Sequence, residues 1–118
     1  MQNLNVDNFS IHISEEENKV ILKWKGKSEF RNPSEILNPY FDEILSELKS
    51  AELHVDFTGL EFMNSSTFPA ILNFMKKCDQ LSLKTLFIYN ASSEWQNASF
   101  KPLKMIGSKL NHINFEAK

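Results

Sequence analysis

The sequence predicts an α/β protein with a mixed, mostly parallel sheet of about five strands and helices mainly on one face, in the order β-β-α-β-α-β-α-β. Three observations support this prediction: an alternating apolar pattern near the N-terminus, three later stretches with helical periodicity, and short apolar strands between those stretches. A helix between two strands is the usual crossover of a parallel pair. The 118 residues suffice for one domain, residues 1–118, and are too few for two.

The N-terminal part predicts an antiparallel hairpin. Apolar and polar side chains alternate over residues 9–13 and again over residues 20–25, which is the period of a half-buried strand. The charged residues 15–18 between these segments form a short polar turn, as expected for a hairpin. Residues 27–33 are expected to be a connection, with Phe30 as its candidate apolar anchor.

A first helix is predicted by an apolar stripe at positions i, i+4, i+7 and i+11, formed by Leu37, Phe41, Ile44 and Leu48. Pro39 cannot lie deep inside a helix without the loss of a hydrogen bond. If Asn38 is the cap, Pro39 becomes the first helical residue and no bond is lost. A looser turn from Ser34 onward is the alternative start.

The next segments predict a strand, a second helix and another strand. Residues 53–57 alternate in polarity and follow a helix, so we expect them to pair in parallel with an earlier strand. The helix that carries Phe68 and Ile71 should end near residues 76–79. A continuous apolar run within residues 83–89 is typical of a strand that is covered on both faces.

The C-terminal part predicts a third helix and an edge strand. Helical periodicity covers residues 95–106, and Pro102 places the start of the regular part near Ser99. Gly107 is expected to stop this helix. Residues 110–115 are expected to form the last strand, at the edge of the sheet.

Composition and charge exclude several classes of protein. The net charge of −2, with both signs interspersed, lacks the basic stripe of a nucleic-acid surface. The single cysteine, Cys78, excludes an internal disulfide and fits a reducing compartment. Residues 1–8 do not resemble a signal peptide, and no apolar run approaches the ~18 residues that span a bilayer. We therefore expect a cytoplasmic protein that binds neither nucleic acid nor membrane.

Neither a metal site nor a catalytic centre is predicted. His12, His54 and His112 are scattered, whereas metal ligands must cluster at set spacings, so we expect no metal and no cofactor. A triad of Asp56, Ser65 and a histidine would lack the Gly-x-Ser-x-Gly elbow. Because no acid, base and nucleophile converge in the sequence, an enzyme is disfavoured.

A run of hydroxyl side chains, Ser65, Ser66 and Thr67, lies where the strand of residues 53–57 gives way, through a short loop, to the second helix. Pro69 fixes the start of that helix, because only the cap and the first three helical residues have N–H groups without an intrahelical acceptor. With Ser66 as cap, Pro69 is the third helical residue and no bond is lost. Ser65 then lies just outside the helix.

Two interpretations of these serines remain open from the residues alone. Both can be capping and turn residues, with Ser66 as a cap that contributes about 1 kcal/mol relative to alanine. Alternatively, Ser65 is phosphorylated, which adds about two negative charges beside a helix N-terminus and expels a docked partner. Phe62, Met63 and Phe68 flank the loop as apolar anchors for such a partner, or they are buried beneath it.

The segment from Val55 to Ser66 resembles the STAS family, the domain shared by sulfate transporters and anti-sigma-factor antagonists. The family pattern is an apolar strand with a terminal aspartate, a short loop with a glycine and an apolar pair, and Asp-Ser-Ser-Gly before an apolar helix. Asp56, Gly59 and the pair Ser65-Ser66 stand at the corresponding positions. The element order also fits, so the resemblance covers nearly the whole chain. Residues 95–115 look more like a subgroup of stand-alone bacterial STAS-like regulators.

The resemblance implies a non-enzymatic regulator that works by partner switching. In the family, a stand-alone domain binds a GHKL-type serine kinase or anti-sigma factor through this loop. We expect this chain to be a monomer or a weak homo-oligomer. The kinase phosphorylates the first hydroxyl residue, here Ser65, although Ser66 remains an alternative. Binding is then lost, and a PP2C-type phosphatase restores it. The implied partner-binding residues are Asn64, Ser66, Thr67, Phe68 and Thr58.

Three residues depart from the family pattern and leave the downstream target open. Asn64 replaces the usual aspartate, and Thr67 and Pro69 replace small residues, usually glycines. An asparagine also precedes the phosphoacceptor in related STAS-like regulators, some of which act on a diguanylate cyclase. A constitutive module for a protein, nucleotide or lipid-like ligand, without phosphorylation, is the other alternative.

Overall fold

The computed structural model describes all residues 1–118 and contains one six-stranded sheet with three helices. The strands, in chain order and also in their order across the sheet, are β1 (Leu4–Val6), β2 (Phe9–Glu16), β3 (Lys19–Ser28), β4 (Glu52–Met63), β5 (Lys84–Tyr89) and β6 (Ile113–Ala117). The helices are α1 (Pro33–Glu47), α2 (Thr67–Gln80) and α3 (Glu94–Gly107). Strands β1 to β3 pair antiparallel, and β3 to β6 pair in parallel.

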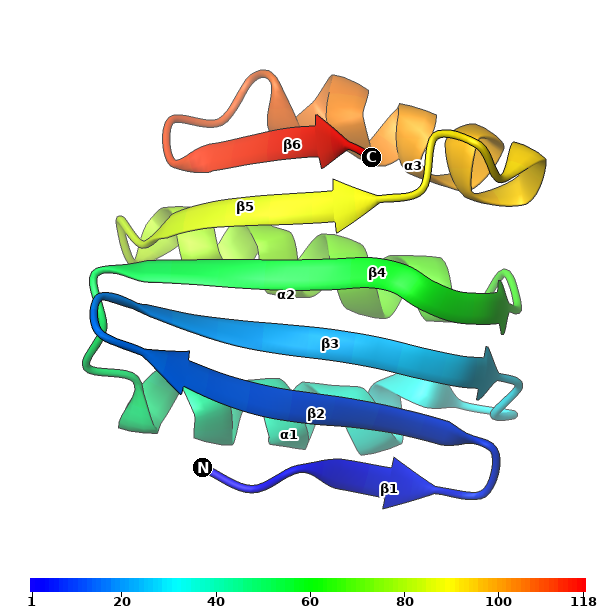
Figure 1. The fold of residues 1–118 in the computed structure, drawn as a ribbon, viewed down its shortest axis with the longest axis horizontal. Helices are drawn as coiled ribbons and strands as arrows, with labels where there is room; N and C mark the ends of the chain where they lie inside the picture. Colours follow the sequence, from blue (N-terminus) through cyan, green and yellow to red (C-terminus); the bar gives the residue numbers. More distant parts are fainter.

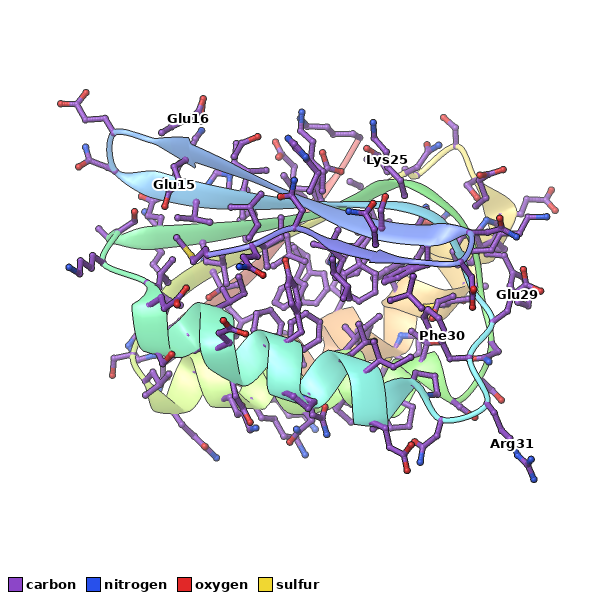
Figure 2. The ribbon with its side chains drawn as sticks, turned by 90° about the horizontal axis from the view of Figure 1, so that it is seen from below. Glu15, Glu16, Lys25, Glu29, Phe30 and Arg31 are labelled. Atoms are coloured by element: carbon purple, nitrogen blue, oxygen red, sulfur yellow. The ribbon has the colours of Figure 1, made fainter.

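All three helices lie on one face of the sheet, as predicted (Figure 1). Turning the molecule shows the sheet as one layer and the helices as the other (Figure 2). Lys25 points away from the helical layer, whereas Phe30 points into the space between the two layers (Figure 2). Phe30 is half-buried and contacts Phe9 edge-on, which confirms its expected role as an anchor.

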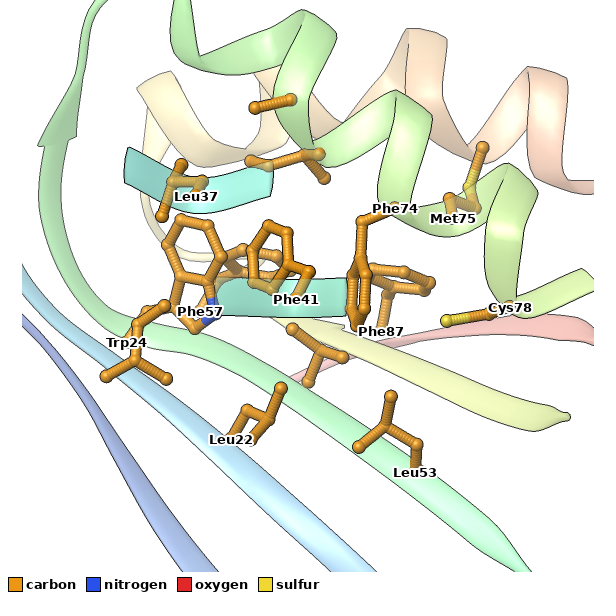
Figure 3. Close-up of a cluster of buried hydrophobic side chains, with 14 of the residues drawn as sticks. Leu22, Trp24, Leu37, Phe41, Leu53, Phe57, Phe74, Met75, Cys78 and Phe87 are labelled. Carbon is orange, nitrogen blue, oxygen red and sulfur yellow. The ribbon is translucent and has the colours of Figure 1, made fainter. Parts of the chain in front are cut away.

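The core between the layers is rich in aromatic side chains (Figure 3). Phe41 of α1 stacks on Phe74 of α2 with ring centroids 4.1 Å apart. Phe57 of β4 contacts Trp24 of β3 and Phe100 of α3, each at 4.7 Å. Aromatic rings from all three helices and from β3 and β4 thus form one connected cluster. Burial of such side chains is the main force that holds the layers together.

The structure contains one more strand than predicted, because β1 pairs with β2 from Leu4↔Ile11 to Val6↔Phe9. This strand is only three residues long and carries too few alternations to be recognised as a period.

None of the helices combines the length and the apolar content needed to cross a membrane.

Two of the three helix starts that were predicted from a proline, those of α1 and α3, were wrong. Helix α1 begins at Pro33, with Pro39 in its interior, and α3 begins at Glu94, with Pro102 in its interior. Both interior prolines are exposed, so each ring lies on the solvent side of its helix, where water can bind the carbonyl group that loses its N–H partner. Gly107 is the last residue of α3, as predicted. A larger residue is excluded there by packing, because a Cβ atom would lie 2.6 Å from the Phe115 ring.

Strand β4 is much longer than the predicted strand of residues 53–57. It pairs with β5 only as far as Asp56↔Ile88, but with β3 it continues to Ser28↔Met63. Two register shifts give β4 two extra residues relative to β3. The segment expected to be a loop before the serines is therefore a bulged extension of the strand, which carries the serines to the edge of the sheet.

Candidate functional site

The hydroxyl loop, residues Asn64 to Ser66, joins the end of β4 to the start of α2. It emerges at the carboxyl ends of the parallel strands, where β3 and β5 also lead into helices, on the right in Figure 1. Ser65 and Ser66 are both exposed. In parallel α/β sheets this carboxyl edge is where binding sites are usually built.

Asn64 holds the loop through both ends of its side-chain amide. Its Nδ2 donates to the carbonyl oxygen of Phe30 at 2.7 Å, and its Oδ1 accepts from the backbone N–H of Thr67 at 3.1 Å and from the Thr67 hydroxyl at 2.7 Å. A carbonyl oxygen only accepts and a backbone N–H only donates, so these partners fix the orientation of the amide. An ionised aspartate at this position would have no hydrogen to donate to the Phe30 carbonyl oxygen.

Thr67 and Ser28 extend this network into the interior. Both are fully buried, and their hydroxyl oxygens lie 2.7 Å apart. Because the single hydroxyl hydrogen of Thr67 goes to Asn64, the Ser28 hydroxyl must be the donor of this bond. A directed chain of hydrogen bonds therefore runs from β3 through the first residue of α2 to the loop.

The serines contribute less to the loop than expected. Ser66 occupies the cap position and Pro69 is the third helical residue, as predicted, but the Ser66 side chain makes no capping hydrogen bond. Its backbone is helical, with φ −72° and ψ −16°, whereas a capping serine has an extended backbone. The Asn64 oxygen takes the Thr67 N–H in its place. The prediction that the Ser66 hydroxyl stabilises α2 as a cap is therefore wrong.

A groove of about 400 Å³ opens beside Ser65. One wall comes from the loop and the start of α2, and the other from α3. The lining residues are Met63, Asn64, Ser65, Phe68, Pro69, Ser99 and Pro102. The walls of the groove are mainly apolar, and the exposed Ser65 is among its lining residues. The groove can therefore receive an apolar side chain of a partner.

The structure brings together only some of the residues predicted to bind a partner. Asn64, Ser65 and Phe68 share the groove, and Ser66 lies beside it on the exposed loop. Thr67 is buried and supports the loop from inside, so its predicted place on a docking rim is wrong. Thr58 lines a separate hollow, where its backbone N–H and hydroxyl both donate to Asp56 Oδ1.

Sequence reasoning missed the contribution of α3. Ser99 and Pro102 line the groove, but they lie more than 30 positions from Ser65 and only the packing of α3 brings them near. Of the three apolar anchors, Phe62 is 45% exposed, while Met63 and Phe68 are half-buried. The alternative that these residues are sealed beneath the loop does not hold for Phe62.

The groups with shifted pKa values lie away from the loop. Hydrogen bonds from the backbone N–H of His112, from the His112 side chain and from the backbone N–H of Asn111 lower the pKa of Asp79 near the end of α2. A hydrogen bond from His54 lowers the pKa of Glu52 at the start of β4. Burial raises the pKa of Cys78 to about 12, so its thiol is unreactive in the folded protein. No group of three potential ligands is placed to hold a metal ion.

Comparison with known proteins gives matches at the level of structure only. The sequence matches no protein-family model and no curated protein. A chain in the crystal structure of the diguanylate cyclase SiaD in complex with its activator SiaC, from Pseudomonas aeruginosa, superposes with a TM-score of 0.69 and 14% identity, covering 98% of this chain and 100% of that chain.

Two further solved structures are similar over almost the same extent. Apo-SiaC from Pseudomonas aeruginosa has a TM-score of 0.60 and 15% identity, with 100% of this chain and 99% of that chain covered. The anti-sigma factor antagonist SpoIIAA in its unphosphorylated form has a TM-score of 0.62 and 15% identity, with 90% and 87% covered. The protein therefore has the STAS-like fold that the Val55 to Ser66 segment led us to expect.

Proposed function

We propose that this protein is a non-enzymatic signalling regulator that binds a protein partner through the Ser65 loop and the adjoining groove, and that phosphorylation of Ser65 releases the partner. One observation carries the proposal. Ser65 is exposed and lies one residue before the cap of α2, while the hydrogen bonds that hold the loop come from Ser28, Phe30, Asn64 and Thr67. Modification of Ser65 therefore leaves the support of the loop intact.

The electrostatics of the loop favour this use of Ser65. A phosphoserine carries nearly two negative charges, which are tolerated beside the positive end of a helix dipole. At the rim of the apolar groove the same dianion would have to lose water when a partner docks, and desolvation of an unpaired charge is strongly unfavourable. Phosphorylation is thus expected to leave the fold unchanged and to weaken docking.

The partners in this proposal are a GHKL-type serine kinase or anti-sigma factor and a PP2C-type phosphatase. Because the kinase requires ATP, we propose that the exchange takes place in the cytoplasm. The similarity to unphosphorylated SpoIIAA, an anti-sigma factor antagonist, supports the proposal at the level of the fold.

A second candidate function is the regulation of a diguanylate cyclase. The observation that favours it is the nearly complete coverage in both directions of a chain from the complex of SiaD with its activator SiaC, together with a similar match to apo-SiaC. In this version the same loop and groove bind the cyclase, and phosphorylation of Ser65 controls that complex.

Mass spectrometry of the protein isolated from its native host tests the modification. We expect a species heavier by about 80 Da, the mass of one added phosphoryl group, that maps to residues 64–67. The added mass should disappear in Ser65→Ala and persist in Ser66→Ala, which is the matched control because Ser66 is also exposed on the same loop. Added mass that is lost only in Ser66→Ala would reassign the site.

A pull-down with purified variants tests the switch. Ser65→Asp should lose a partner that wild type and Ser66→Ala retain, while its thermal unfolding midpoint stays within about 2 °C of wild type, as for most exposed substitutions. Assay of the captured partner for diguanylate cyclase or serine kinase activity separates the two candidate functions. If Ser65→Asp keeps every partner and Ser65 is never modified, the protein is a constitutive binding module.

A further inference from the structure

Gln96, in the first turn of α3, lies where β4 has no neighbouring strand on one side. Beyond the pair Asp56↔Ile88, β4 continues against β3 alone. The Gln96 side chain is almost completely buried, and its Nε2 donates to the carbonyl oxygens of Phe57 at 2.7 Å and Leu60 at 2.9 Å. The glutamine thus supplies the donors that β5 supplies to the earlier part of β4.

The third hydrogen-bonding position of this amide is also occupied. Gln96 Oε1 accepts from the backbone N–H of Asn90 at 2.8 Å. Because carbonyl oxygens only accept and the Asn90 N–H only donates, the amide has one orientation that satisfies all three partners. A buried polar group that is fully satisfied in this way rigidifies the elements that it joins, here α3, β4 and the end of β5.

One of the two carbonyl groups that Gln96 binds, that of Phe57, lies inside the first bulge of β4, and the other, that of Leu60, lies just after it. Between Asp56 and Gly59 this strand has one residue more than β3 opposite. Asp56 Oδ1 holds the other side of the bulge by accepting from Thr58. Because a bulge bends and twists its strand, the path of β4 to the Ser65 loop depends on the geometry that Gln96 maintains.

Gln96 also fixes the opposite wall of the groove. Ser99 and Pro102 line the groove from α3, and Ser99 lies one helical turn after Gln96. The first turn of α3 lies at the same edge of the sheet as the end of β4 (Figure 1). One buried amide therefore holds both walls, the strand that delivers Ser65 and the helix that faces it.

We propose that Gln96 is a positioning residue of the Ser65 site: by fastening α3 to the bulged part of β4, it sets the separation of the groove walls and hence the shape that a partner recognises. The expected effect of Gln96 on partner binding rests on the proposed function. The expected effect of Gln96 on the Ser65 loop does not depend on that function and can be measured without a partner.

The test compares Gln96→Met, which keeps the length of the side chain but removes all three hydrogen bonds, with wild type and with Gln80→Met. Gln80 is an exposed glutamine near the end of α2, so Gln80→Met makes the same chemical change away from the site. Amide hydrogen exchange is the first readout. We expect faster exchange at Asn64 and Thr67, whose N–H groups are hydrogen-bonded, and unchanged exchange in β2. Gln80→Met should match wild type at all these amides.

Partner affinity is the second readout, with the partner captured by wild type as the probe. Gln96→Met should bind on the order of tenfold more weakly, as expected for the loss of a buried hydrogen bond. If wild type captures no partner, the proposed function fails, and the exchange data still decide the structural part. Wild-type exchange at Asn64 and Thr67, or uniform acceleration in every strand, would overturn the inference.

A milder variant covers the case in which Gln96→Met does not fold. Gln96→Glu keeps the shape and the acceptor, and both it and wild type are measured at a pH low enough to protonate the carboxyl group, which then donates one hydrogen bond where Gln96 donates two. We expect intermediate exchange at Asn64 and Thr67 and an intermediate affinity. If Gln96→Glu also fails to fold, or behaves as wild type, Gln96 is only a stabilising residue and the inference is wrong.

Discussion

Two neighbouring connections of the same kind show how differently similar sequences can use their serines. The loop between β4 and α2 begins with Asn64 and contains Ser65 and Ser66, and the loop between β5 and α3 begins with Asn90 and contains Ser92 and Ser93. In the second loop the Ser93 hydroxyl caps the helix by accepting from the Gln96 N–H at 3.4 Å.

The first loop is held by its asparagine and threonine instead. Asn64 reaches across to the Phe30 carbonyl group, whereas Asn90 uses its side chain only within its own loop, as acceptor for the Ser92 N–H. Thr67 has a buried hydroxyl partner in Ser28. With the support moved to these residues, Ser65 and Ser66 face solvent. The difference therefore lies in which residues support each loop, and it can be tested by substitution.

Thr67→Val should give the largest effect on stability. Valine has the shape of threonine and the same branching at Cβ, but it removes the acceptor for the buried Ser28 hydroxyl. An unsatisfied buried hydroxyl costs about 1–3 kcal/mol, so we expect urea unfolding, followed by the fluorescence of buried Trp24, to shift to lower concentration. The double variant Ser28→Ala with Thr67→Val should recover part of the loss, because no hydroxyl is then left unpaired. Equal stability of the single variant and wild type would contradict the chain of hydrogen bonds.

The matched pair Asn64→Asp and Asn90→Asp tests the comparison directly. At neutral pH, Asn64→Asp places a carboxylate against the Phe30 carbonyl oxygen and should destabilise the protein by about 1–2 kcal/mol. Asn90 uses only its oxygen, which aspartate retains, so Asn90→Asp should be nearly neutral. Urea unfolding of both variants in one buffer gives the difference.

The pH dependence of Asn64→Asp sharpens this result. Its protonated carboxyl can donate to the Phe30 carbonyl group, so the folded state binds a proton more tightly than the unfolded chain. The folded pKa is then the higher one, and the deficit relative to wild type is largest above it and narrows as pH falls through it. A deficit that widens in acid would show that position 64 does not face the Phe30 carbonyl oxygen.

The sequence predicted the elements and the place of the site better than the contacts that hold the site. The apolar periodicity of the β2, β3 and α2 segments could be recognised in the sequence because each of these elements has one buried face. Pro69 correctly located the start of α2, because proline leaves only a few tolerated positions. The support from Ser28 and Phe30, and the groove wall from α3, depend on tertiary packing that no local pattern encodes. Pro39 and Pro102 misled because a proline on the solvent side of a helix is tolerated, whereas the prediction treated each proline as incompatible with the interior of a helix.

The smallest expected effect on stability distinguishes the two helix-cap residues, Ser93 and Ser66. Ser93→Ala removes a side-chain acceptor from the Gln96 N–H and should destabilise the protein by about 0.5 kcal/mol, at the low end for a cap because the bond is long at 3.4 Å. Ser66→Ala removes no hydrogen bond and should leave the unfolding midpoint unchanged, or raise it slightly because alanine favours the helical backbone that Ser66 already has. Thermal unfolding of the two variants side by side measures the difference. A larger loss in Ser66→Ala than in Ser93→Ala would mean that the first loop does rely on its serine, and the distinction between the two connections would not hold.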